Sequence, residues 1–268
     1  MKKAYFASLV VVAFIALGIL SVPKTMAEKQ IKEKASVKVK GATPENPVVY
    51  LGKSFDKKSG KEVEGYAIVH YAKNANKPTK PSSGTTCYGY IAKGAKWRVA
   101  PEGWYVNTAN SEGLSSDFIV SNLNDDIKKW EGYAGKTILG SGVVTSDALM
   151  PDETAPDNKN EVVFGDVDSP GAIAVTIVWG IFGGNPNNRQ LIEWDMIFDE
   201  TDFHWGINEA DKMDFENIAT HELGHAVGMG DLYNSSCVEQ TMYGYANYVQ
   251  INKRSLESGD ITGIGLLY

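Results

Sequence analysis

One short stretch, HELGHAVGMGD from His221 to Asp231, restricts the fold of this chain more than any other part of the sequence. On a helix, His221 and His225 project from the same face, and two imidazoles at that spacing can reach one metal ion. Glu222 then lies beside such an ion, where its carboxylate can accept a proton from a metal-bound water. Gly228 can adopt a left-handed conformation that ends the helix and brings Asp231 back as a carboxylate ligand. Two imidazoles and one carboxylate leave a coordination position free for water, which is typical of catalytic zinc.

Capping residues and hydrophobic periodicity predict three helices. Asp214 can cap a helix that runs to about Val227, and either Ser115 or Ser116 can cap an earlier one. A last helix is expected from about Leu256. The residues expected on the buried faces of these helices are Ile119, Leu123, Ile127 and Trp130, then Phe215, Ala219, Leu223 and Ala226, then Ile261, Ile264 and Leu267.

Strand-like runs fall into two groups. Two runs lie near the N-terminus, at residues 48–51 and 66–71, and His70 in the second is expected to be a half-buried strand residue rather than a ligand. The other runs are residues 97–106, 137–144, 161–167, 172–179 and 191–198. The order of elements predicts an α+β fold in which one twisted mixed sheet is backed by two long helices, with a mostly irregular C-terminal part.

The charge of the chain changes sign at Cys87. Residues 1–87 hold 15 Lys/Arg and 6 Asp/Glu (+9), whereas residues 88–268 hold 11 Lys/Arg and 27 Asp/Glu (−16). A split of this size is typical of a tail or prosegment on a differently charged domain. The acidity of the larger part argues against nucleic acid as its partner.

The first 27 residues have the layout of a secretory signal peptide. Two lysines precede the apolar run 4–20, and Ala27 is the expected last residue before cleavage. The alternative is an uncleaved anchor, for which the run is at the lower limit of length. No later stretch is apolar enough to span a membrane, so we expect a secreted protein with no stable membrane span after cleavage.

Residues 28–86 are expected to form a basic N-terminal arm or a removable prosegment, ending in a linker at 72–86. Two readings of this segment remain, a prosegment held against the acidic domain and a solvated arm. In an oxidising compartment Cys87 and Cys237 suggest one disulfide. The alternative is that Cys87 provides a thiolate that keeps the protein latent.

The stretch from His221 to Asp231 resembles the zinc motif of the metzincin zinc endopeptidases. Their zinc motif reads H-E-x-x-H-x-x-G-x-x-H, and the snapalysin-like branch has Asp in the last position, as here at Asp231. The segment 241–245 is similar to the metzincin Met-turn. Segments 194–205 and 256–268 look like the matrixin segment before the active-site helix and the helix that closes matrixin catalytic domains. The resemblance covers residues 87–268.

This resemblance implies a catalytic domain with a five-stranded mixed sheet, two long helices and a small irregular C-terminal subdomain that ends in a helix. It implies one catalytic zinc ion held by His221, His225 and Asp231, with Glu222 as general base and Met242 and Gly228 as structural support. Residues 172–179 resemble the edge strand that pairs with an extended substrate. The loop after Met242 resembles the one that forms the specificity pocket.

Two further predictions concern metals. The loop with Asp199 and Asp202 could bind calcium, as the equivalent matrixin loop does, although solvated acidic surface is the simpler expectation. Ile197 stands where matrixins have a histidine ligand, so we expect no second zinc ion. His204 is expected to be a loop or packing residue.

The function predicted from these observations is that of a secreted, monomeric, zinc-dependent endopeptidase acting on proteins or peptides. The alternative is a non-cleaving extracellular binding module on a metzincin scaffold. A third reading keeps the metal and assigns another hydrolase activity.

Overall fold

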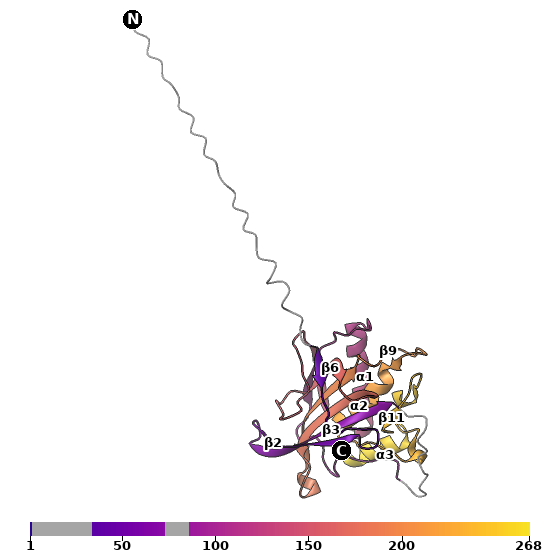
Figure 1. Cartoon of the computed structure of the whole chain (residues 1–268). Coiled ribbons are helices and arrows are strands. Elements are labelled where there is room, and N and C mark those ends of the chain that lie inside the picture. Colours follow the sequence, from indigo (N-terminus) through magenta and orange to yellow (C-terminus); the bar gives the residue numbers. More distant parts are fainter. Residues whose placement is uncertain (2–33, 73–85) are drawn as a thin grey trace. The chain divides into compact units, whose positions relative to one another are not determined.

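The computed structural model describes Met1 and residues 34–72 and 86–268, which build an α+β fold around one large mixed sheet (Figure 1). The predicted signal peptide, residues 1–27, lies outside the described residues. Within the described ranges, no helix has the length and apolar character needed to cross a membrane.

The main sheet contains nine strands within the described residues. They are β1 (Ala35–Val37), β2 (Val48–Asp56), β3 (Lys61–Ala72), β4 (Glu102–Val106), β5 (Leu139–Val144), β6 (Glu161–Val167), β7 (Ala172–Ile181), β8 (Gln190–Asp199) and β11 (Tyr245–Ala246). Two short strands, β9 (Trp205–Gly206) and β10 (Met213–Asp214), pair with each other in parallel. The helices are α1 (Ser116–Ala134), α2 (Phe215–Ala226) and α3 (Ser258–Leu267), with 3-10 turns η2 (Pro186–Asn188), η3 (Ser235–Cys237) and η4 (Asn252–Arg254).

The strand order is β11-β3-β7-β8-β6-β4-β5, with β1 added to β6 and β2 added to β3. β5, β4, β6 and β8 run parallel, whereas β7 is antiparallel to both β8 and β3. The five strands β4 to β8 correspond to the predicted core of the sheet. The prediction of five strands is therefore too low, because β1, β2, β3 and β11 extend the sheet to nine strands within the described residues.

Residues 34–72 belong to the same packed unit as the rest of the described chain. The segment before Cys87 thus packs on the rest of the described chain, and its division from residues 87–268 as an arm or prosegment stays a prediction. The stretch Ala67–Tyr71 is buried on both faces of the sheet, which is typical of a central strand and not of a solvated arm.

The sheet buries an apolar layer on each face. On one face α1 and α2 pack on Phe164, Met196 and Phe198, and the Trp130 indole of α1 donates a 2.9 Å hydrogen bond to the Thr220 carbonyl of α2. On the other face, alternate residues of the central strands, such as Val175, pack beneath the segment around β1. Because successive side chains of a strand point to opposite faces of the sheet, neighbouring residues pack in different hydrophobic cores.

The helix boundaries agree with the predicted caps. Ser115 Oγ accepts from the Phe118 amide at 3.2 Å at the start of α1, and Asp214 Oδ1 accepts from the Asn217 amide at 2.9 Å at the start of α2. The C-terminal helix begins at Ser258. A disulfide joins Cys87 to Cys237 with an S–S distance of 2.05 Å, as the cysteine count suggests.

Candidate metal centre and active site

Three side-chain atoms converge where α2 meets the loop that follows it. The Nε2 atoms of His221 and His225 lie 3.2 and 3.4 Å from Asp231 Oδ1, and the two imidazole rings are perpendicular at 4.9 Å. All three atoms are buried, and none has a hydrogen-bond partner among the described residues. A buried polar atom without a partner costs about 1–3 kcal/mol. A metal ion between the three would supply the missing partner, so this donor set fits zinc.

The geometry of Gly228 explains how Asp231 returns to the helix. Gly228 has φ of +103°, and a Cβ at this position would lie 2.8 Å from the Ala95 carbonyl oxygen. The chain therefore turns sharply after α2, and the Met229 amide donates to the Gly224 carbonyl at 2.8 Å. Tyr233 donates its hydroxyl to Asp231 Oδ2 at 2.6 Å, which leaves Oδ1 directed at the histidines.

Backbone carbonyls orient both imidazoles. His221 Nδ1 lies 2.7 Å from the Thr241 carbonyl oxygen, and His225 Nδ1 lies 3.0 Å from that of Met229. Each Nδ1 donates a proton to its carbonyl, so each Nε2 presents a lone pair toward the centre. Burial lowers the pKa of His221 to about 3, so its ring is neutral.

Met242 supports α2 from below. Its side chain is fully buried, and a Cβ added at Gly224 would lie 2.2 Å from its sulfur atom. The turn that carries Met242 is held by Asp260 of α3, whose carboxylate accepts from the amides of Thr241 at 2.7 Å and Met242 at 3.2 Å. α3 therefore fixes the turn whose carbonyl orients His221.

The Glu222 carboxylate lies next to this centre and is fully buried. Its Oε2 accepts from the Thr176 hydroxyl of β7 at 2.6 Å, and its Oε1 lies 3.0 Å from His70 Nδ1 of β3. Burial raises the pKa of Glu222 to about 7. A carboxylate with this pKa can exchange a proton near neutral pH.

His70, Thr176 and Lys253 are site residues that the sequence does not reveal. His70 was expected to be half-buried, but it is 1% exposed, and its ring stacks on His221 with centroids 3.9 Å apart. Its Nε2 lies 3.0 Å from Lys253 Nζ, which also donates to the Tyr243 carbonyl. The pairing of β3 with β7 brings His70 opposite Ala174. No local motif signals this long-range register.

The residues suggested for calcium are engaged in other contacts. Asp199 Oδ1 accepts from the amides of Thr201 and Asp202, and its Oδ2 accepts from the Val167 amide. His204 is exposed and lies 3.0 Å from Glu112. Calcium binding by this loop stays a prediction. A different acidic group, Asp152, Glu193 and Asp195, brings its carboxylate oxygens within 4.8 Å of one another.

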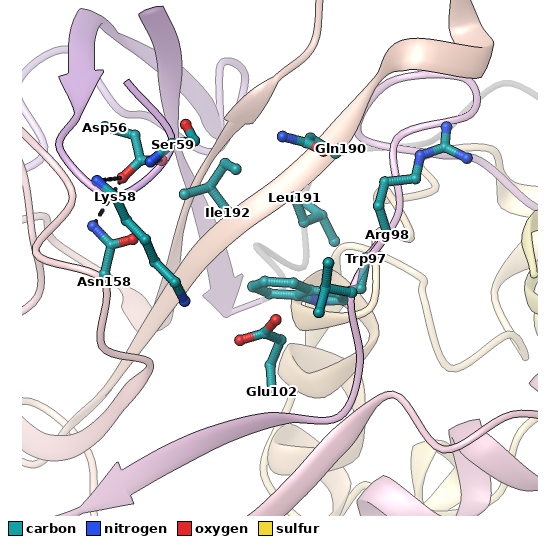
Figure 2. Close-up of a pocket in the computed structure, with 11 residues that line it drawn as sticks. Asp56, Lys58, Ser59, Trp97, Arg98, Glu102, Asn158, Gln190, Leu191 and Ile192 are labelled. Atoms are coloured by element: carbon teal, nitrogen blue, oxygen red, sulfur yellow. Dashed lines mark hydrogen bonds between the residues drawn. The ribbon is translucent and has the colours of Figure 1, made fainter. Parts of the chain in front are cut away.

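A surface pocket lies away from the metal centre (Figure 2). Apolar side chains of Trp97, Leu191 and Ile192 line it together with Asp56, which accepts a hydrogen bond from Asn158 Nδ2 at 2.9 Å. Of the described residues, those that line this pocket do not come from α2 or the loop that follows it. The pocket is therefore separate from the candidate centre.

Residues 182–268 match the matrixin family model. The matched part contains β8, α2, the Met242 turn and α3, and the match supports a metzincin-like matrixin domain and a zinc metallopeptidase. No curated protein matches the chain. The match begins after β7, so it does not include β3 or the residues that β3 contributes to the site.

Proposed function

We propose that this protein is a secreted zinc-dependent endopeptidase that hydrolyses internal peptide bonds. The observation that carries the proposal is the convergence of three buried, unpartnered donor atoms, from His221, His225 and Asp231, beside the Glu222 carboxylate. The matrixin match supports peptide substrates. The signal-like N-terminus supports secretion.

In this proposal the three converging residues hold one zinc ion. When bound, zinc supplies Lewis acidity, which acidifies a water molecule and polarises the scissile carbonyl. Glu222 accepts the proton of the attacking water and delivers it to the leaving nitrogen. The Thr176 hydroxyl fixes Glu222 Oε2, so that Oε1 is the oxygen that exchanges the proton.

The alternative of a non-cleaving binding module is less well supported. A metal site that has lost its activity usually lacks a metal ligand or the base. Here the three proposed ligands and Glu222 are all present and convergent. A hydrolase acting on other bonds would need the same metal and base, and only the matrixin match favours peptides.

The test combines metal analysis with hydrolysis of casein, with and without a chelator, for the protein as purified and after limited proteolysis. We expect one zinc ion per chain and hydrolysis that stops when the chelator is added. An Asp231→Ala variant should lose the zinc, whereas the control Glu209→Gln, an exposed residue, should keep it. One bound zinc ion without hydrolysis in either preparation would support the binding module instead.

A further inference from the structure

Five positively charged side chains gather around the loop before β4 and the end of α3. They are Lys93, Lys96, Arg98, Lys136 and Arg189. Arg98 Nε donates to the Arg189 carbonyl at 2.9 Å, and Arg189 Nη1 donates to the Lys93 carbonyl at 3.1 Å. The other hydrogen bonds of the two guanidinium groups to described residues also end on backbone carbonyls. Because a carbonyl is neutral, these bonds tie the loops together and leave the positive charges uncompensated.

The two remaining lysines flank the end of α3. Lys96 Nζ donates to the Leu267 carbonyl at 2.6 Å. The ammonium groups of Lys96 and Lys136 lie 5.4 and 5.7 Å from the centre of the Tyr268 ring. Burial, together with the positive charges of Arg98 and Lys136, lowers the pKa of Lys96. Lys96 therefore lies close to other cations, without an acidic group to offset them.

The lack of carboxylate partners is particular to this cluster. Residues 88–268 hold 11 Lys/Arg and 27 Asp/Glu, so the cluster contains five of the 11 cations. Outside it, five of the other six form ion pairs, namely Lys128, Lys129, Lys159, Lys212 and Arg254. Within the described ranges, none of the five clustered cations does so. In so acidic a part of the chain, this separation leaves concentrated positive charge available to an external anion.

A cavity of about 520 Å³ opens among these cations. Lys93, Lys96 and Arg98 line it, and no Asp or Glu is among its described lining residues. The rings of Tyr88 and Tyr90, with centroids 5.8 Å apart, form part of its wall. It is a different cavity from that of Figure 2, with which it shares only Arg98. Its volume lies within the range of about 300–1,000 Å³ that is typical of small-molecule sites.

The size of the cavity decides between two classes of anion. A phosphate group carries about −1.5 to −2 charges at neutral pH, so two or three of them match five cations in a compact ligand. A polypeptide would need about five acidic residues, which span about 16 Å when extended. A cube of 520 Å³ has an edge of only about 8 Å. The cavity therefore favours a compact phosphate ligand over an acidic polypeptide.

We propose that this cationic pocket, lined by Lys93, Lys96 and Arg98, binds a compact ligand that carries two or more phosphate groups. The ammonium groups of the lysines bind phosphate oxygens as point charges, and Lys136 and Arg189 add positive charge around them. The inference does not depend on the proposed peptidase function, because no residue of the candidate metal centre lines the pocket.

The test is isothermal titration calorimetry of the zinc-loaded full chain with myo-inositol hexakisphosphate. We expect one site per chain, with an affinity that falls when NaCl is raised from about 50 to about 200 mM, since salt screens exposed charges. The double variant Lys93→Gln/Lys136→Gln should weaken binding at least about tenfold, because two charge-assisted contacts are lost. Both side chains are exposed, so the fold should be preserved.

The matched control is Lys128→Gln/Lys159→Gln. It removes the same charge from two surface lysines that already have carboxylate partners, and it should bind the phosphate probe as the wild type does. Heat from the affinity of the probe for zinc is common to both double variants, so it cancels in their comparison.

A second measurement uses only the wild-type chain. Acetic anhydride labels exposed lysines, and mass spectrometry locates the labels. The phosphate probe should protect Lys93 and Lys136 from labelling, whereas Lys128 and Lys159 should react as before. This measurement decides the question if the pocket variant does not fold.

The inference is overturned if the phosphate probe does not bind, or if the two double variants weaken binding equally, because binding would then follow net charge alone. Two further titrations test the ligand class. Orthophosphate should bind at least about tenfold more weakly than the probe, since it brings fewer charges. Equal binding of orthophosphate would contradict a site for several phosphate groups, and equal binding of an octaglutamate peptide would assign the pocket to acidic polypeptides instead.

Discussion

Replacing Asp260 with alanine should damage the metal centre from a distance. Asp260 is buried in α3, and its carboxylate accepts from the amides of Thr241, Met242 and Glu257. Thr241 and Met242 are fully buried, so Asp260→Ala leaves two buried N–H groups without an acceptor. Each such group costs about 1–3 kcal/mol, which gives a loss of about 2–6 kcal/mol in the free energy of unfolding.

The same variant should weaken zinc binding. The Thr241 carbonyl orients His221 through a 2.7 Å hydrogen bond, and Asp260 fixes the Thr241 backbone. Loss of an outer partner of a metal ligand typically reduces metal affinity by 10–100-fold, and we expect about tenfold because Asp260 acts through one further residue. The two effects are separable, because the first is measured on the zinc-free protein.

Urea unfolding followed by circular dichroism gives the stability change, and competition with a chromophoric chelator gives the zinc affinity. Asp125→Ala is the matched control, since Asp125 is exposed and pairs only with the neighbouring Lys128 on the surface of α1. It should change the free energy of unfolding by less than about 0.5 kcal/mol. If Asp260→Ala unfolds at the wild-type urea concentration and binds zinc as tightly, then α3 does not support the centre as described.

Three further predictions follow from other parts of the molecule. Because Cys87 and Cys237 are 150 residues apart, replacing both with serine should lower the free energy of unfolding by about 3–5 kcal/mol in urea titrations; an unchanged midpoint would contradict this. Removing zinc with a chelator should lower the melting temperature, since at a free zinc concentration of about 1,000 times Kd the ion stabilises the folded state by about 4 kcal/mol. Burial raises the pKa of Asp126 from 3.8 to about 7, so the folded protein binds this proton more tightly than the unfolded chain and stability should fall as the pH rises between these values. Asp126→Asn should remove that part of the pH dependence of the urea midpoint, and a pH profile identical to that of the wild type would refute the assignment.

Helix α2 and the loop that follows it could be predicted from the sequence, because the residues that determine them are neighbours in the chain. The cap at Asp214, the apolar stripe of α2 and the turn at Gly228 all lie within a short stretch of sequence. The same stretch supplies His221, His225 and Asp231, so the convergence of the three donors needs little more than the helix period and one glycine turn. The fold contributes the orienting carbonyls of Thr241 and Met229.

The position of β3 beside the site could not be predicted in the same way. The run Ala67–Tyr71 predicts a strand, but its partner β7 lies about a hundred residues later, and periodicity does not specify which strands pair. His70 and Glu222 are 152 residues apart in sequence. A lone histidine in an apolar strand is usually a packing residue, so only the three-dimensional register shows that this one meets Glu222.

The most direct test of the central claim is the rate of chelator-sensitive casein hydrolysis per bound zinc ion, measured for the wild type and for Glu222→Gln after the same limited digestion. Glutamine keeps the shape of the side chain but cannot accept the proton. We predict that Glu222→Gln binds one zinc ion as the wild type does and hydrolyses casein at least about a hundredfold more slowly. Equal rates per zinc ion would contradict the assignment of Glu222 as the base and of this centre as the active site.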